Sequence, residues 1–215
     1  MKDNIFWNVD TQIDFMKPDG KLPVGEKQEG AEEIEPNLEY LTELARENQY
    51  TIVNTADWHN QDSEELSENP DFVETFPEHC MASSQGAEYV EAVKPEDPLV
   101  FDWREDYCIE KELQKPVEEI VVYKDRFDVF EGSPHTEDIL NQLDPEEAVV
   151  YGVATDVCVD QAVKGLTDRG LDVYVVEDAV KGIDPSASDN SENSWKERDV
   201  ETILSMEVEE YLERS

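Results

Sequence analysis

Basic side chains are scarce in this chain of 215 residues, and their scarcity limits what the chain can bind. Lysine and arginine together number 17, against 55 aspartates and glutamates, so the formal net charge is −38. A charge of this sign repels the phosphates of nucleic acids and the anionic head groups of lipids. We therefore expect no nucleic acid and no membrane among its partners.

Cysteines, long apolar runs and targeting signals are also scarce or missing. The three cysteines lack the spacing of a disulfide framework, which favours a reducing compartment. No segment approaches the roughly 20 apolar residues of a membrane span. The first residues lack the basic and apolar regions of a signal peptide. These absences predict a cytoplasmic protein.

The acidic residues are spread over almost the whole chain rather than gathered in one tail. Such a distribution is typical of a solvated acidic shell. Its self-repulsion is screened in concentrated salt, because the Debye length falls to about 3 Å at 1 M. A halophilic source is therefore our hypothesis. Intrinsic disorder is the alternative that high charge and low hydropathy favour, but the compact apolar runs of the chain argue against it.

Six short runs rich in β-branched and aromatic residues predict buried strands, at 5–9, 50–54, 99–101, 120–123, 148–153 and 173–176. Helical spacing of apolar residues separates several of them, most clearly at 34–45 and 157–166. Strands that alternate with helices predict an α/β fold with a mainly parallel sheet. Right-handed crossovers should cover both faces of that sheet with helices.

The length suits one domain spanning residues 1–215. Residues 60–94 are polar, lack a clear period and contain Pro70 and Pro77, so they predict a long loop of the kind that forms functional sites. Residues 185–191 also have the composition of a loop. We expect residues 195–212 to form a C-terminal helix that closes the chain.

Reactive side chains follow four of the predicted strands. Asp10 follows the run at 5–9, and Asp57 and His59 follow the run at 50–54. Lys124 follows the run at 120–123, and Cys158 opens the helix after the run at 148–153. In a parallel sheet the carboxyl ends of the strands share one edge, where a crevice forms. We expect these five residues to meet there.

Cys158, Asp10 and Lys124 have the chemistry of a nucleophile, a base and a charged partner. A cysteine in the first turn of a helix faces unpaired amides and the positive end of the helix dipole, which favour the thiolate. A carboxylate that ends an apolar strand is desolvated, which raises its pKa toward that of a base. A lysine can hold that carboxylate and the charge that develops on a substrate. The alternatives are structural: a cysteine that only packs, an aspartate that caps a turn and a lysine that reaches solvent.

Asp57, His59 and His79 offer mixed oxygen and nitrogen donors, which suit Zn²⁺, Mn²⁺ or Fe²⁺. Only three histidines occur in the chain, and two of them belong to this group. We therefore predict one divalent metal ion as cofactor. The alternative is a pair of loop histidines that hold no ligand.

Three aromatic residues lie next to these candidates in the sequence: Phe15, Trp58 and Phe76. Aromatic side chains are more often part of a core than a platform for a ligand. We nevertheless expect Phe15 and Phe76 to bind substrate by enclosing a planar ring.

Several segments combine these residues in one order along the chain: VDTQIDF at 9–15, TADWH at 55–59, FPEHC at 76–80 with QGAE at 85–88, YK at 123–124 with Asp128 and Phe130, and GVATDVCV at 152–159. Together they resemble the motifs of the isochorismatase-like superfamily, and within it those of the nicotinamidases. The resemblance reaches to about Gly182. It implies a three-layer α/β/α fold around a central, mainly parallel sheet, and it makes dimers or larger homo-oligomers an expectation.

The resemblance also implies a catalytic triad of Asp10, Lys124 and Cys158. It implies a cis peptide between Val153 and Ala154, which turns the Ala154 amide toward an oxyanion together with the Cys158 amide. The implied activity is hydrolysis of a small-molecule carboxamide, foremost nicotinamide to nicotinic acid and ammonia, through a Cys158 thioester.

The metal ligands implied by the resemblance are Asp57, His59 and His79, where the ion holds the pyridine nitrogen and waters. A further histidine that nicotinamidases often place shortly after the first is missing, and only an acid at position 64, 65 or 68 can replace it. Phe76 stands where a tryptophan is common.

Two other classes of function stay open on the sequence. The first is a metal-free relative, such as an isochorismatase-like enzyme or a carbamoyl or ureido amide hydrolase. The second is a non-catalytic small-molecule binding protein on the same fold. A redox protein is the weakest alternative, because no two cysteines have Cys-x-x-Cys spacing.

Overall fold

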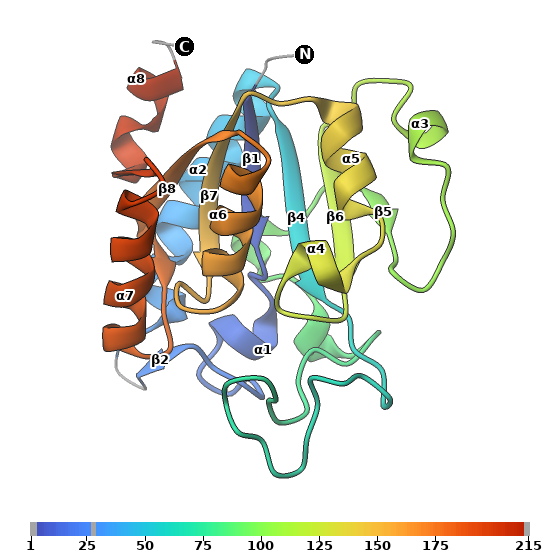
Figure 1. Ribbon diagram of the computed structural model, residues 1–215, viewed down its shortest axis with the longest axis vertical. Coiled ribbons are helices and arrows are strands. Elements are labelled where there is room, and N and C mark those ends of the chain that lie inside the picture. Colours follow the sequence, from blue (N-terminus) through green and yellow to red (C-terminus); the bar gives the residue numbers. More distant parts are fainter. Residues whose placement is uncertain (1–3, 27–28, 213–215) are drawn as a thin grey trace.

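A seven-stranded parallel sheet forms the centre of the protein, as seen in a computed structural model that describes residues 4–26 and 29–212 (Figure 1). All six strand pairs in this sheet are parallel. In spatial order the strands are β5 (Leu99–Phe101), β6 (Glu119–Lys124), β4 (Thr51–Asp57), β1 (Asn4–Val9), β7 (Glu147–Val153), β8 (Asp172–Lys181) and β9 (Glu201–Ile203).

Both faces of the sheet are buried, since every residue of its central strands β1, β4 and β7 is buried. Along β1, Trp7 packs into the core cluster on one face and Phe6 into the cluster on the other, as the alternation of side chains along a strand requires. Helix α2 (Glu35–Asn48) covers the face of Phe6 with Leu38 and Leu41. The opposite face is covered by the helices in front of the sheet in Figure 1: α4 (Val129–Gly132), α5 (Thr136–Leu143), α6 (Cys158–Asp168) and α7 (Pro185–Lys196). The predicted three-layer α/β/α fold is therefore confirmed.

The remaining elements are short. The helices are α1 (Ile13–Met16), α3 (Ile109–Glu112) and α8 (Val208–Leu212), and the 3₁₀ helices are η1 (Ala31–Ile34), η2 (Gln85–Ala87), η3 (Glu91–Val93) and η4 (Ser205–Glu207). Strands β2 (Gly25–Glu26) and β3 (Glu29–Gly30) pair as a small antiparallel ribbon. Among the helices of residues 4–26 and 29–212, none is long and apolar enough to cross a membrane.

The C-terminal part differs from the prediction. Residues 185–191, expected to be a loop, begin α7, where Pro185 takes the first helical position and Asp184 caps the Ala187 amide at 2.8 Å. Residues 195–212, expected to be one helix, contain the end of α7, the edge strand β9 and α8. The predicted helix was wrong because its middle pairs with β8, between residues 174–176 and 201–203.

The segment between β4 and β5 agrees better with its prediction. Over residues 60–94 the described structure contains only η2 and η3 as helices and no strand of the main sheet. This segment lies at the carboxyl ends of the strands, below the sheet in the view of Figure 1. It therefore contributes to the edge where the reactive side chains were expected.

Candidate active site

Lys124 is the centre of a buried group of charges at the carboxyl edge of the sheet. Its Nζ lies 2.9 Å from Asp10 Oδ2, donates to Asp57 Oδ1 and lies 3.9 Å from Cys158 Sγ. The side chains of Lys124 and its two aspartates are almost fully buried. The structure thus brings together the three residues predicted as base, charged partner and nucleophile, and adds Asp57 to them.

Neighbouring strands hold this group in place. Asp10 takes a left-handed backbone conformation at the end of β1, with φ of 49°, and its Oδ1 accepts a bond of 2.7 Å from the Thr55 hydroxyl. The side chain of Gln12 clamps the backbone of Asp57, since Nε2 donates to the carbonyl oxygen and Oε1 accepts from the amide, each at 2.8 Å. The two aspartates are therefore fixed relative to each other by contacts between β1 and β4.

Close backbone packing of β7 against β1 brings Cys158 near Asp10. A Cβ at Gly152 would lie 2.1 Å from the carbonyl oxygen of Val9, and its φ is 118°, so only glycine fits. Cys158 is the first residue of α6 and lies after the turn at Ala154. The peptide between Val153 and Ala154 is cis, as the resemblance implied.

The protonation of these groups follows from burial and charge. Burial raises the pKa of Cys158 well above its usual range, although Lys124 opposes the shift. The start of a helix was expected to favour the thiolate, but desolvation outweighs this effect on the pKa of Cys158. Burial also raises the pKa of Asp10, again against Lys124. By contrast, Lys124 and the nearby histidines outweigh burial at Asp57 and hold its pKa well below its usual range.

Asp57, His59 and His79 present three buried donor atoms that lie within 4.8 Å of one another. Oδ2 of Asp57 is 3.6 Å from Nε2 of His59 and 3.4 Å from Nε2 of His79. The Nδ1 atom of His79 is 2.7 Å from the carbonyl oxygen of Pro77, which can only accept, so Nδ1 carries the proton and Nε2 faces the group.

A divalent cation fits this set of donors. Nε2 of His59 is buried and lacks a hydrogen-bond partner, and a metal ion would satisfy it. The pKa of His59 rises to about 9 because the nearby carboxylates of Asp125 and Asp57 outweigh burial. The site therefore favours positive charge, which a divalent ion can supply in place of the proton. Two nitrogens and one carboxylate oxygen are typical ligands of Zn²⁺ and of other transition metals.

Glu65 is the acid that joins this group, out of the three considered from the sequence. It is buried, whereas Glu64 and Glu68 are exposed. Its Oε2 lies 4.0 Å from Nε2 of His59, and its Oε1 accepts a 2.5 Å bond from the Phe127 amide. Burial and the nearby Asp57 raise the pKa of Glu65 to about 7.

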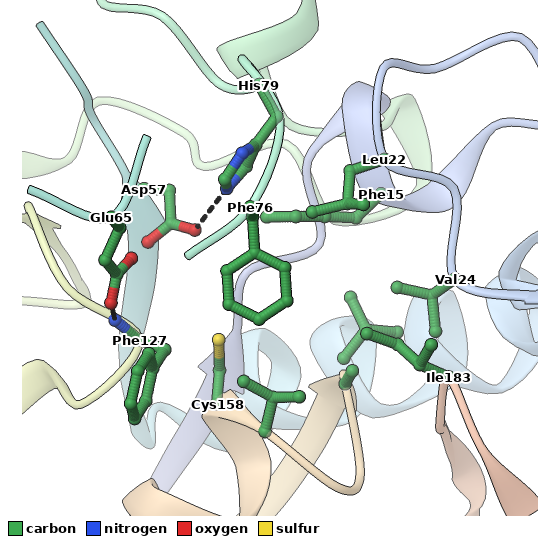
Figure 2. Close-up of a pocket in the computed structure, with 13 residues that line it drawn as sticks. Phe15, Leu22, Val24, Asp57, Glu65, Phe76, His79, Phe127, Cys158 and Ile183 are labelled. Atoms are coloured by element: carbon green, nitrogen blue, oxygen red, sulfur yellow. Dashed lines mark hydrogen bonds and ion pairs between the residues drawn. The ribbon is translucent and has the colours of Figure 1, made fainter. Parts of the chain in front are cut away.

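A mostly apolar pocket opens next to these groups (Figure 2). The sulfur of Cys158 points into the space beneath the Phe76 ring, with the donor residues on one side and aliphatic side chains on the other. The lining residues are Phe15, Leu22, Val24, Asp57, Glu65, Phe76, His79, Phe127, Val153, Ala154, Val157, Cys158 and Ile183. Phe15 and Phe76, which the sequence predicts to bind substrate, are both among them.

Trp58 does not line this pocket. Its ring stacks on Tyr123 at a centroid distance of 4.1 Å, on the other side of the strand ends. Residues 57 and 58 point in opposite directions at the end of β4, as side chains along a strand alternate. Its neighbour Asp57 faces the pocket instead.

Asp125, Phe127 and the aliphatic lining residues were missed from the sequence. Asp125 Oδ1 lies 3.1 Å from Nδ1 of His59. Its position directly after Lys124, at the carboxyl end of β6, was the one signal that pointed to the site. Leu22 and Val24 reach the pocket from the loop before β2, and Ile183 reaches it from the turn after β8; their sequence gives no comparable signal.

Comparisons with known proteins agree with this geometry. The family model for the isochorismatase domain matches residues 5–206. A nicotinamidase/pyrazinamidase of Mycobacterium tuberculosis is 25% identical over 201 residues, which cover 92% of this chain and 96% of that protein. A nicotinamidase of Acinetobacter baylyi is 27% identical over 213 residues, which cover 88% of this chain and 85% of that protein.

Solved structures give the same result. The crystal structure of the pyrazinamidase of Pyrococcus horikoshii in complex with zinc is similar with a TM-score of 0.74 and 26% identity, over 94% of this chain and 99% of that one. The relatives named here are amide-hydrolysing enzymes that share the fold and nearly the full length of the chain. The chain therefore belongs to the isochorismatase family, and its resemblance to the nicotinamidase branch of that family is confirmed.

Proposed function

We propose that the protein hydrolyses a neutral aromatic carboxamide, foremost nicotinamide to nicotinic acid and ammonia, through a thioester on Cys158. One observation carries the proposal: the buried Lys124 ammonium lies 2.9 Å from Asp10 and 3.9 Å from the sulfur of Cys158, and Cys158 lines a mostly apolar pocket. Such a set of nucleophile, base and charged partner is what amide hydrolysis by covalent catalysis requires.

The first half of the reaction forms the thioester. Asp10, whose ionised form Lys124 favours, takes the proton from the Cys158 thiol, and the sulfur attacks the amide carbon. The amides of Ala154 and Cys158 donate to the oxyanion, each contributing on the order of 3 kcal/mol. The carbon–nitrogen bond then breaks, and the proton held by Asp10 passes to the leaving nitrogen, so that ammonia departs.

The second half releases the acid. A water molecule gives a proton to Asp10 and attacks the thioester carbon, and the carbon–sulfur bond breaks. The proton returns to the sulfur of Cys158, so that the enzyme regains its starting state. The raised pKa of Cys158 makes the neutral thiol its resting form, which is why the base is needed in each turnover.

Asp57, His59, His79 and Glu65 would hold the metal ion. When bound, the ion supplies a positive anchor for a ring nitrogen of the substrate and for waters. Lys124 contacts Asp57 through Oδ1, while Oδ2 faces both histidines. Asp57 thus links the catalytic group around Lys124 to the metal donors, and it sets the position of the substrate relative to Asp10.

The pocket itself favours a neutral planar substrate. Among the described residues that line it, none is a lysine or an arginine, whereas Asp57 and Glu65 are acidic. An anionic substrate would therefore meet like charge without a partner. Phe15 and Phe76 offer aromatic faces for a ring, and both of their rings also pack against His79, at centroid distances of 5.2 and 6.3 Å.

The test is ammonia release from nicotinamide by the purified protein in concentrated salt, with the metal content measured on the same sample. We expect about one metal ion per chain and release of ammonia by the wild type but not by Cys158→Ala. Bound metal with untouched nicotinamide and pyrazinamide would overturn the substrate and leave the metal site standing.

A metal-free amide hydrolase is the second candidate, supported by the geometry of the triad, which does not itself need an ion. Dialysis against a chelator separates the two. Full activity of the metal-free protein would favour this candidate, and loss of activity that zinc, manganese or iron restores would favour the first. A third class, a binding protein without activity, predicts that Cys158 does not react with an electrophile such as iodoacetamide.

A further inference from the structure

Two segments far apart in the sequence pair residue by residue beside the metal donors. The Ser63 hydroxyl donates to Asp125 Oδ1, Glu64 forms an ion pair with Arg126, and Glu65 accepts from the Phe127 amide. Residues 63–65 of the long loop thus lie in register on residues 125–127, which directly follow Lys124 at the end of β6. The loop that carries the metal donors is fixed to the strand that carries the catalytic lysine.

The three pairs differ in what they hold. The pair of Glu64 and Arg126 is largely exposed, with 77% and 42% of the side chains accessible, so it contributes little. The pair of Glu65 with the Phe127 amide orients a carboxylate that faces the metal donors. The pair of Ser63 with Asp125 holds the carboxylate of Asp125. The same Oδ1 atom of that carboxylate also contacts Nδ1 of His59.

The orientation of His59 depends on this contact. A carboxylate only accepts, so Nδ1 carries a proton and Nε2 is the nitrogen that faces Asp57 and Glu65. His79 obtains the same orientation from the backbone carbonyl of Pro77 within its own loop. His59, which is fully buried, relies on a side chain from a different element.

We propose that Asp125 is the positioning residue of the metal site, which fixes His59 with Nε2 toward the ion and couples that orientation to the end of the strand that bears Lys124. The proposal rests on the metal site of the proposed function. Ligating histidines depend on such second contacts, and their loss typically costs about 10-fold to 100-fold in metal affinity. Asp125 itself neither lines the pocket nor belongs to the three clustered donors.

The experiment measures zinc affinity of the metal-free protein by competition with a chromogenic chelator, without any substrate. Asp125→Ala removes the acceptor of the His59 proton, and Asp125→Asn keeps an acceptor but removes its charge. Glu64→Gln is the matched control, because it removes one negative charge from the same paired segments without touching a donor. We expect zinc to bind about 10-fold to 100-fold more weakly to Asp125→Ala. Asp125→Asn should lie between that variant and Glu64→Gln, which should match the wild type within twofold.

A second readout separates positioning from a general loss of structure. In the metal-free protein, circular dichroism and the melting temperature of Asp125→Asn should match those of Glu64→Gln, while its zinc affinity is lower. Equal affinities of Asp125→Asn and Glu64→Gln would overturn the proposal, even if Asp125→Ala fails to fold. A wild type that binds no divalent ion would overturn the metal site as well, whereas tight binding by all variants would overturn this inference alone.

Discussion

The two halves of the site are built in different ways. Asp10, Lys124 and Cys158 stand at the ends of sheet strands or at the start of a packed helix, so the backbone of the core positions them. His59, Glu65 and His79 lie in a long segment without strands of the main sheet. Hydrogen bonds from residues 125–127 position His59 and Glu65, and the carbonyl of Pro77 in the same loop positions His79.

Because of this difference, the two halves should differ in local stability. The half at the strand ends shares the free energy of the core, because moving it requires breaking parallel strand pairs. The loop half depends on a few polar contacts and on the ion that its donors favour, so it should open at lower cost than the sheet. Asp57 joins the halves, since one oxygen contacts Lys124 and the other faces the two histidines.

The largest effect expected is on chemistry at the strand ends. Replacing Cys158 by alanine should lower amide hydrolysis by about 10⁴-fold or more, because a nucleophile that acts as part of a unit has no substitute. The same variant should bind zinc as the wild type does, which keeps the two halves distinct. Cys108→Ala, at an exposed cysteine away from the pocket, is the control. Steady-state ammonia assays and metal analysis measure both properties; residual activity above a tenth of the wild type would contradict the assignment.

Next in size is the effect of the buried lysine on stability. Lys124→Met leaves the carboxylates of Asp10 and Asp57 buried without their cation, so we expect a loss of about 3–5 kcal/mol in the free energy of unfolding. Urea denaturation monitored by circular dichroism measures it. The control Lys17→Met removes a partly exposed ion pair with Glu35 and should cost less than about 1 kcal/mol. Similar losses for the two variants would show that the strand-end half does not depend on its central charge.

Removal of the metal should act on the loop half. At a metal concentration 100-fold above the dissociation constant, binding stabilises the folded state by about 2.7 kcal/mol. After chelation, amide hydrogen exchange should accelerate within residues 58–84 and change little in the strands β1, β4 and β7. Mass spectrometry of peptides resolves the two regions. Uniform acceleration across the sheet would break the distinction between the halves.

The sequence was a good guide to the half at the strand ends, for a physical reason. Apolar runs predicted six of the seven main strands near their true positions, and the carboxyl ends of parallel strands must share an edge. Asp10, Lys124 and Cys158 were therefore brought together by reasoning about topology alone. Helix α7 was missed because its first residues are serines and polar residues of low helical propensity. Its support is tertiary, since the Trp195 indole donates to Asp160 at 2.9 Å.

The loop half was predictable in its residue types but not in its contacts. Glu64, Glu65 and Glu68 are equivalent in the sequence, and only the folded chain buries the second of them. The pairing of residues 63–65 with 125–127 joins positions 62 apart, and no periodicity in either segment encodes it. Contacts of this kind follow from how two irregular segments meet at the edge of the sheet, which local patterns do not determine.

Salt should have the smallest effect on stability, and it should stabilise the loop half more than the half at the strand ends. The buried carboxylates are balanced by Lys124, whereas exposed acids such as Glu64 and Glu68 contribute to a net charge of −38 that salt screens. Raising KCl from 0.1 to 1 M should stabilise the fold on the order of 1–2 kcal/mol, which corresponds to about 2–8 °C in melting temperature for a chain of this size. Screening is nearly complete at 1 M, so the gain should level off there, while stabilisation by exclusion of salt from the surface would continue to rise.

Hydrogen exchange should slow more within residues 60–80 than in β1 or β7. A melting temperature that does not change up to 1 M would mean that the acidic shell does not strain the fold, and slowing confined to the strands would reverse the order of stability inferred for the two halves.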